Sequence, residues 1–274
     1  MLSARKAQQG FSLVELVTVI IILGILATSI SSFLRFGTQS YTDASDREEL
    51  IGSARFLIER LNREVRYALP NSLRTIGNNE QCLEFMPIDQ SVTYLDIPVA
   101  PETSSNSISV LMLDSPLSSS TSYVSVYALN SSDIYRRQSG VIEKFSSVVS
   151  ANDKAQPSII NFSSNVLFNA ESPTNRLYFI GGPISYCLEN KVVYRYEGYD
   201  DGDYNISTGI PGTSATRVMM AEYIENFSLS ENIVPFQTIP ATLQRNGLVL
   251  VQFKFVRNLE EIVFSNEIQV PNVP

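Results

Sequence analysis

Histidine is absent from this 274-residue chain, and cysteine occurs only twice. Histidine is the commonest general base and transition-metal ligand, so its absence removes Ser–His pairs, Cys–His pairs and HExxH metal sites. The sequence also lacks the GxxxxGK[ST] phosphate loop, the GxGxxG dinucleotide motif and the GxSxG nucleophile elbow. A Ser–Lys dyad or a carboxylate pair would leave no such pattern, and nothing points to one. We therefore expect no enzymatic activity.

Positive charge is also scarce, because 20 Lys and Arg residues stand against 28 Asp and Glu, for a formal net charge of −8. A surface that binds nucleic acid needs clustered Lys and Arg to contact phosphates, so we expect no nucleic-acid partner. Hydrophobic residues make up 44% of the chain and charged residues 18%, which is typical of a folded protein.

The two cysteines, Cys82 and Cys187, are too far apart in sequence for a CxxC redox motif or a cysteine-rich zinc site. In an oxidising periplasm such a pair usually forms one disulfide, which would stabilise the fold by up to about 4–5 kcal/mol. Two separate buried thiols are the alternative. The choice depends on the compartment in which the domain resides.

The N-terminal region contains one long apolar segment. Residues 1–10 are polar and include Arg5 and Lys6, whereas Phe11–Ile30 carries a single charge, on Glu15. About 20 helical residues span the hydrocarbon core of a bilayer, and the preceding basic residues keep the N-terminus cytoplasmic. The segment is too long for a signal peptide and lacks a clear A-x-A-like site. A plain anchor gives no reason for Glu15, because a carboxylate in the bilayer costs about 2.5–3.5 kcal/mol.

The string Gly10-Phe11-Ser12-Leu13-Val14-Glu15 resembles the class III signal of type IV prepilins and type II secretion pseudopilins. The resemblance implies that a prepilin peptidase cuts between Gly10 and Phe11 and methylates the new N-terminus at Phe11. Glu15 would become the fifth mature residue and pair with the N-terminal amine of a neighbouring subunit. The resemblance also implies an inner-membrane, single-pass precursor with a periplasmic head, which later joins a pilus at the cell surface.

The helical pattern continues beyond the membrane segment. A stripe of apolar residues recurs at helical spacing, and Pro70 should end the helix. The stripe comprises Leu50, Ala54, Leu57, Leu61, Val65 and Ala68. We predict one helix from Phe11 to about Leu69, with Gly24 and Gly37 as soft points. The predicted organisation is a leader (1–10), a membrane or filament-core half-helix (11–35), an amphipathic half-helix (36–69) and a β-rich head (70–274).

Short strand-like runs bounded by Asn, Gly, Pro and Ser follow Pro70, and they predict an α+β protein with a mostly antiparallel β head. The predicted strands are Cys82–Met86, Ile108–Leu113, Tyr123–Leu129, Leu177–Ile180, a hairpin of Ile184–Leu188 with Val192–Tyr196, and a pair of Leu248–Val256 with Ile262–Val270. For the Ser-rich tract at about 103–164, a flexible insertion and a sheet remain equal alternatives.

An acidic cluster at residues 200–205 offers one candidate metal site. Asp201, Asp203 and Asn205 place oxygen ligands at alternate positions, as at the start of a calcium loop. Ile206 and Gly212 then stand where an EF-hand needs glycine and glutamate. A solvated acidic turn is the favoured interpretation, and calcium is the only cofactor considered.

Two further stretches point to a subgroup within the resembled family. Arg63–Ser72 and the C-terminal Phe255–Pro274 are similar to minor pilin-like proteins of MSHA pilus biogenesis, and the arrangement is more distantly similar to the J-type pseudopilin of type II secretion. The chain is also larger than a typical major pilin. These resemblances imply a subunit that joins other minor pilins and the major pilin to start filament assembly. An adhesive tip module, with the Ser-rich tract and the acidic loop as its binding surface, is the alternative.

Overall fold

The computed structural model describes residue 10 and residues 12–111, 113, 115–151, 156–199, 210–212, 215–227, 232–242, 245–258 and 260–271. The elements run in the order α1 (Leu13–Arg66), β1 (Arg74–Ile76), the 3-10 helix η1 (Asn78–Glu80), β2 (Cys82–Phe85), β3 (Ile88–Asp96), β4 (Ser105–Val110), β5 (Tyr123–Val126), α2 (Ser131–Tyr135), β6 (Ile142–Val149), β7 (Ser158–Val166), β8 (Arg176–Ile180), β9 (Ile184–Glu189), β10 (Val192–Glu197), β11 (Thr216–Ala221), β12 (Phe236–Ile239), β13 (Gly247–Arg257) and β14 (Glu260–Val270). A long helix followed by mostly antiparallel sheets confirms the predicted α+β class.

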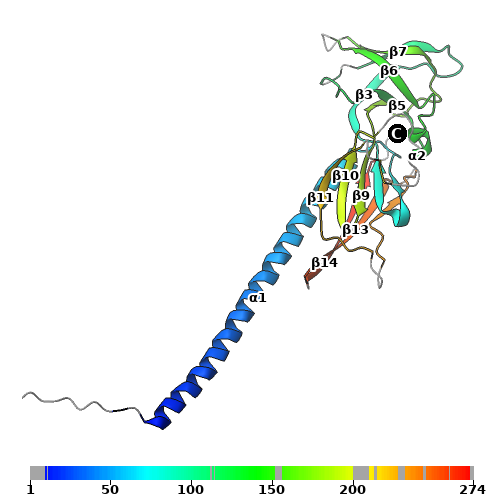
Figure 1. Ribbon diagram of the computed structural model, residues 1–274. Coiled ribbons are helices and arrows are strands. Elements are labelled where there is room, and N and C mark those ends of the chain that lie inside the picture. Colours follow the sequence, from blue (N-terminus) through cyan, green and yellow to red (C-terminus); the bar gives the residue numbers. More distant parts are fainter. Residues whose placement is uncertain are drawn as a thin grey trace, which may run out of the picture. The chain divides into compact units, whose positions relative to one another are not determined.

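The chain divides into two compact units. The first is formed by Met1–Glu49 with Asn258–Glu260, and the second by Leu50–Arg257 with Glu261–Pro274. The helix α1 is 54 residues long and passes from one unit to the other, and Figure 1 shows it as a single uninterrupted helix.

Helix α1 ends at Arg66, three residues before the predicted end at Leu69. The cause is a change of hydrogen-bond partner, because the Leu69 amide donates to the Met86 carbonyl at 2.7 Å and the Ile88 amide donates to the Tyr67 carbonyl at 3.0 Å. The last predicted turn therefore pairs with the chain that enters β3 instead of continuing the helix. The predicted start at Phe11 lies outside the described residues, and the described helix begins at Leu13.

The second half of α1 supplies the core of the head. All six residues of the predicted apolar stripe are at most 2% exposed. They belong to one cluster with side chains from two sheets, which includes Leu83, Phe85, Tyr186, Phe236, Val251, Phe253, Phe255 and Ile268. The five-stranded sheet has the order β1-β2-β9-β10-β11 and the three-stranded sheet has the order β12-β13-β14. The helix is therefore held by both sheets through its apolar face.

Two predicted strand pairs are confirmed. Strands β9 and β10 pair antiparallel with Val192 opposite Glu189, and the two turn residues Asn190 and Lys191 have φ values of 48° and 70°. Positive φ at both positions is the geometry of a tight hairpin whose twist matches that of its strands. Strands β13 and β14 are neighbours in the three-stranded sheet.

The Ser-rich tract contributes to a sheet. Strands β3, β4, β7, β6, β5 and β8 close into a barrel in that order, and Figure 1 shows its labelled strands grouped apart from β9–β14. The barrel has its own apolar core, which includes Val110, Val124, Ile160, Leu177 and Phe179. Of the two alternatives for the tract, the structure therefore supports a sheet.

The barrel is inserted between two strands of the five-stranded sheet. Strands β2 and β9 are direct neighbours, with Phe85 opposite Ile184, yet the whole barrel lies between them in sequence. At its base, the Tyr135 hydroxyl donates to the Ser72 carbonyl at 2.9 Å and the Asn71 side chain donates to the Ala128 carbonyl at 3.0 Å. The segment that follows α1 is thereby bonded to the base of the barrel.

We expect Leu57→Ala to lower the free energy of unfolding by about 2–5 kcal/mol, because it removes a fully buried side chain and leaves a cavity. The matched control Glu59→Ala, two residues away on the exposed face, should change it by less than about 0.5 kcal/mol. Urea unfolding of the full chain in detergent, followed by circular dichroism, measures both. Equal effects of the two variants would contradict the packing described here.

Candidate functional site

The first half of α1 presents an apolar surface that no described residue of its own unit covers. By length and composition α1 can cross a membrane, and none of its most apolar window of 18 residues is buried. The large exposed side chains include Leu13, Val14, Leu16, Val17, Val19, Ile20, Ile21, Ile22, Leu23, Ile25, Leu26, Ile30, Phe33, Leu34 and Phe36. A surface of this kind requires lipid or other apolar helices around it.

Three hydroxyl side chains of this segment donate hydrogen bonds to carbonyl groups of the helix itself. Thr18 donates to the Glu15 carbonyl at 3.0 Å, and Thr28 and Ser29 both donate to the Ile25 carbonyl at 2.9 Å. Such hydrogen bonds remove unpaired hydroxyl groups from an apolar environment, where each would be costly. The helix also continues without interruption through Gly24, one of the two predicted soft points.

Glu15 is the exception in this apolar segment. Its side chain is exposed in the first turn of α1, and it forms no ion pair with any residue that the structure describes. The helix dipole favours an acid at this end by only about 0.3–1 kcal/mol. That gain is smaller than the cost of about 2.5–3.5 kcal/mol for a carboxylate in a bilayer, so Glu15 needs a partner beyond the residues that the structure describes.

The structure describes some of the other predicted site residues and leaves others out. Gly10 is described and exposed, whereas Phe11 and the calcium candidates Asp201, Asp203 and Asn205 lie outside the described residues. Within the described part of the chain, no group of three or more His, Cys, Asp or Glu side chains is placed to hold a metal ion.

The disulfide between Cys82 and Cys187 is present and joins β2 to β9. The two residues are direct partners in the antiparallel ladder, and both are fully buried. The bond closes a sequence separation of 105 residues that contains the whole barrel. Of the two predicted alternatives for the cysteines, the disulfide is therefore confirmed and separate buried thiols are excluded.

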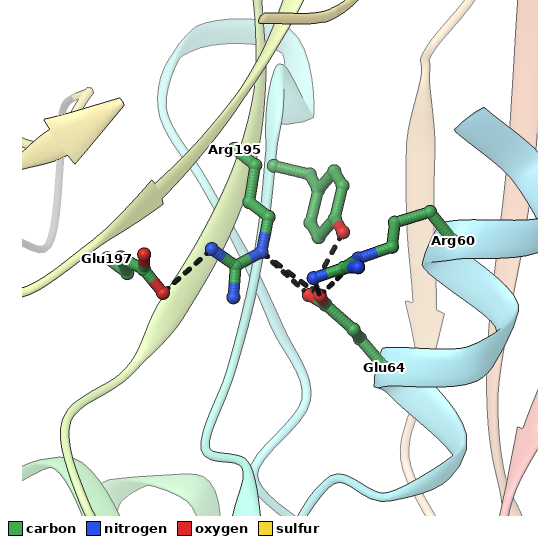
Figure 2. A network of polar contacts seen from close by, with 5 residues as sticks. Arg60, Glu64, Arg195 and Glu197 are labelled. Carbon is green, nitrogen blue, oxygen red and sulfur yellow. Dashed lines mark hydrogen bonds and ion pairs between the residues drawn. The ribbon is translucent and has the colours of Figure 1, made fainter. Parts of the chain in front are cut away.

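A polar network that the sequence did not reveal fastens the last turns of α1 to the five-stranded sheet. In Figure 2 the Glu64 carboxylate lies between the guanidinium groups of Arg60 and Arg195, with Glu197 on the other side of Arg195. Arg195 Nε is 2.9 Å from Glu64 Oε2, and Arg60 Nη2 is 2.6 Å from Glu64 Oε1. The Tyr186 hydroxyl donates to Glu64 at 2.9 Å. One carboxylate on α1 thus binds groups from both β9 and β10.

The network also changes the pKa values of its members. Burial, together with the negative charge of Glu64, raises the pKa of Tyr186, so its hydroxyl stays protonated as a donor. Burial lowers the pKa of Arg195, but its hydrogen bonds to Glu64 and Glu197 outweigh this and raise it overall. Both raised pKa values keep Tyr186 a neutral donor and Arg195 a cation at physiological pH, which suits a structural contact.

A second buried carboxylate, that of Glu84 on β2, is also bound by polar side chains of the head. Its side chain is 1% exposed, forms an ion pair with Arg74 and accepts a hydrogen bond from Tyr199 at 2.7 Å. Ser185 contacts the same tyrosine hydroxyl at 2.6 Å, and the Arg74 guanidinium lies 3.6 Å from the Tyr135 ring centroid. Burial, then the charge of Glu84, raises the pKa of Tyr199 well above its usual value. This cluster ties β1 and β2 to Tyr199, which directly precedes the acidic cluster in sequence.

Comparison with known proteins gives one match. The family described as the prokaryotic N-terminal methylation motif matches residues 5–31. No curated protein and no solved structure matches the chain. The matched residues contain Gly10 and Glu15 and most of the exposed apolar half of α1, so this family signal coincides with the surface that requires a partner.

Arg195→Ala should lower the free energy of unfolding by about 3 kcal/mol, because it leaves Glu64 partly buried without its sheet-side cation. Lys191→Ala is the matched control, since Lys191 forms an exposed ion pair with Glu225, and it should cost less than about 1 kcal/mol. Chemical denaturation of the full chain in detergent measures the difference. If Arg195→Ala proves as mild as Lys191→Ala, the network does not fasten α1 to the sheet.

Proposed function

We propose that the chain is a minor pilin-like subunit of an MSHA-type type IV pilus, and the N-terminal methylation motif matched at residues 5–31 supports its place among type IV prepilins and pseudopilins. Its proposed role is filament assembly and initiation near the tip. The observation that carries the proposal is the exposed apolar half of α1, with one unpaired carboxylate near its start and a folded head at its other end.

Processing is the first step of the proposed function. A prepilin peptidase cuts between Gly10 and Phe11 and methylates the amine of Phe11. The matched motif at residues 5–31 supports this step, because it encloses both residues and the apolar segment that follows them. Cleavage at this junction leaves the apolar helix on the mature protein, unlike the removal of a secretory signal peptide.

Glu15 is proposed as the group that sets the position of the subunit relative to its neighbour in the filament. Its carboxylate pairs with the N-terminal amine of Phe11 on a neighbouring subunit, which offsets the cost of an unpaired acid among apolar helices. An initiating subunit at the very top has no subunit ahead of it and needs no such acid. The presence of Glu15 therefore favours a position just below the top.

The proposed location follows from the helix and the disulfide. The apolar half of α1 holds the precursor in the inner membrane, with the basic residues Arg5 and Lys6 on the cytoplasmic side. The head then lies in the periplasm, where the disulfide between Cys82 and Cys187 is stable. The proposed partners are the prepilin peptidase, other minor pilins and the major pilin. This role requires no catalytic site.

The barrel favours a second candidate function, adhesion at the tip. It is a closed sheet with its own apolar core, inserted into a head whose other sheets already pack on α1. The sequence of such an inserted barrel can change without disturbing the sheets that pack on α1. A J-like pseudopilin of type II secretion is the remaining alternative, since the same N-terminal motif serves both systems.

Cells that lack the protein distinguish an assembly role from an adhesion role. If the subunit initiates assembly, cells without it should carry far fewer surface filaments, counted by electron microscopy. Restoring the wild-type protein should restore the number of filaments. A normal number of filaments that no longer adhere to a surface would contradict the assembly role and support the adhesion module.

Glu15→Ala should insert into the membrane normally yet enter filaments about tenfold less than wild type, because the charge pair with the neighbouring subunit is lost. Glu48→Ala, an exposed acid on the same helix, is the matched control and should incorporate normally. Immunoblots of sheared filaments and of membranes measure the two pools. Normal incorporation of Glu15→Ala would defeat the charge-pairing role.

A further inference from the structure

The outer side of α1 from Arg55 to its end is rich in basic and aromatic residues and holds one exposed acid, Glu59, although the chain as a whole is acidic. Arg55, Arg63 and Arg66 are exposed there, Phe56 is 57% exposed and Tyr67 is 70% exposed. We call these five residues the basic aromatic face. It lies opposite the buried apolar stripe, and it contrasts with the formal net charge of −8.

Helical spacing brings these residues together. Arg63 is seven residues after Phe56 and three before Arg66, and side chains at these spacings share one side of a helix. Tyr67 directly follows the end of α1, so an exposed aromatic residue lies at the end of this face. Aromatic residues and arginine are the side chains enriched in protein interfaces and in their energetic centres.

The cations of this face are not engaged by the chain itself. Among the residues that the structure describes, Arg55, Arg63 and Arg66 form no ion pair, whereas Arg60 on the same helix contacts Glu64. Glu59 is four residues from both Arg55 and Arg63, but it pairs with neither. The helix dipole favours Arg63 and Arg66 near its C-terminal end, but it accounts for neither Arg55 nor the two exposed aromatic rings.

We propose that the basic aromatic face docks on an acidic surface of a neighbouring pilin head, an inference that rests on the proposed filament function. Charge complementarity selects the partner, because three unpaired guanidinium groups attract carboxylates and repel basic surfaces. Phe56 and Tyr67 supply the apolar contact. The face therefore recognises the adjoining subunit outside the membrane, while Glu15 acts within the apolar segment.

Anionic lipid headgroups are the other binding partner that basic and aromatic residues favour. The sequence argues against a lipid partner for this face. Three acidic residues that are not buried, Asp43, Glu48 and Glu49, stand between the apolar segment and this face, against one basic residue, Arg47. These acids would repel anionic headgroups. The proposed orientation also places the face on the side away from the cytoplasm, whereas the anionic surface potential belongs to the cytoplasmic leaflet.

Site-specific cross-linking tests the partner directly. The described cysteines are joined in the disulfide, and the chain has no others, so Tyr67→Cys introduces the single free thiol of the full-length protein. A benzophenone maleimide attached to that thiol should cross-link, in cells that produce pili, to another pilin-like subunit at a peptide containing Asp or Glu. The yield should fall as salt rises. Gln138→Cys, exposed on the barrel side of the head, is the control thiol and should not give this adduct.

Adducts formed only with lipid, only with a second copy of this chain, or not at all would overturn the proposal. The same holds if the captured peptide carries no acid. The adduct is identified from whatever fraction of the Tyr67→Cys variant reaches a neighbouring subunit. This measurement therefore does not require that the variant assemble at wild-type efficiency.

Charge reversal tests the contribution of the face to assembly. Arg63→Glu combined with Arg66→Glu should lower incorporation into filaments about tenfold at an unchanged membrane level. Arg136→Glu, an exposed arginine on the barrel side of the head, is the matched control and should incorporate normally. Reversing the acids in the captured partner peptide to Arg should restore incorporation.

Wild-type incorporation of the reversed variant would overturn the docking proposal. It would leave the proposed function standing if Glu15→Ala still fails to incorporate, so the two failures are distinguishable. If the reversed variant is lost from the membrane, the cross-linking result alone decides, because that variant then reports on folding.

Discussion

The structure depends on one helix that must be buried in two different surroundings. Its first half has large apolar side chains on all sides and needs lipid or other helices. Its second half has a single apolar stripe that is fully covered by strands from two sheets. Burial of a leucine or valine side chain contributes about 1.5–3 kcal/mol, so the stripe alone makes α1 inseparable from the head fold. The head in turn determines which face of the helix stays exposed.

Polar groups define how the helix sits in the head, since apolar contacts alone are not directional. Glu64 is bonded to side chains on two neighbouring strands, which fixes the rotation of the last turns of α1 against the sheet. The disulfide between Cys82 and Cys187 holds together the two strands that flank the inserted barrel. An insertion at that point leaves the sheet register intact, which explains how the head can carry an extra module without losing its packing on α1.

The sequence was informative where one simple physical rule applied. Helical spacing identified the buried stripe that includes Leu57 and Leu61, and strict alternation identified β13. The network around Glu64 was not predictable, because Arg195 and Tyr186 are more than a hundred residues away and no local pattern links them. The barrel was predicted only in part, because exposed Ser and Asn in its strands resemble a flexible tract, and so a sheet and an insertion remained equal alternatives. At the N-terminus, the matched methylation motif supports the predicted resemblance, while the roles of Phe11 and Glu15 stay predictions.

The central claim is that this chain is cut before Phe11 and built into a filament. Mass spectrometry of sheared and purified surface filaments tests it directly, in cells that produce the protein. The account predicts a peptide that begins with N-methylated Phe11 and is present at low abundance beside a major pilin. A protein that is absent from the filaments and remains in the membrane with residues 1–10 still attached would contradict the account.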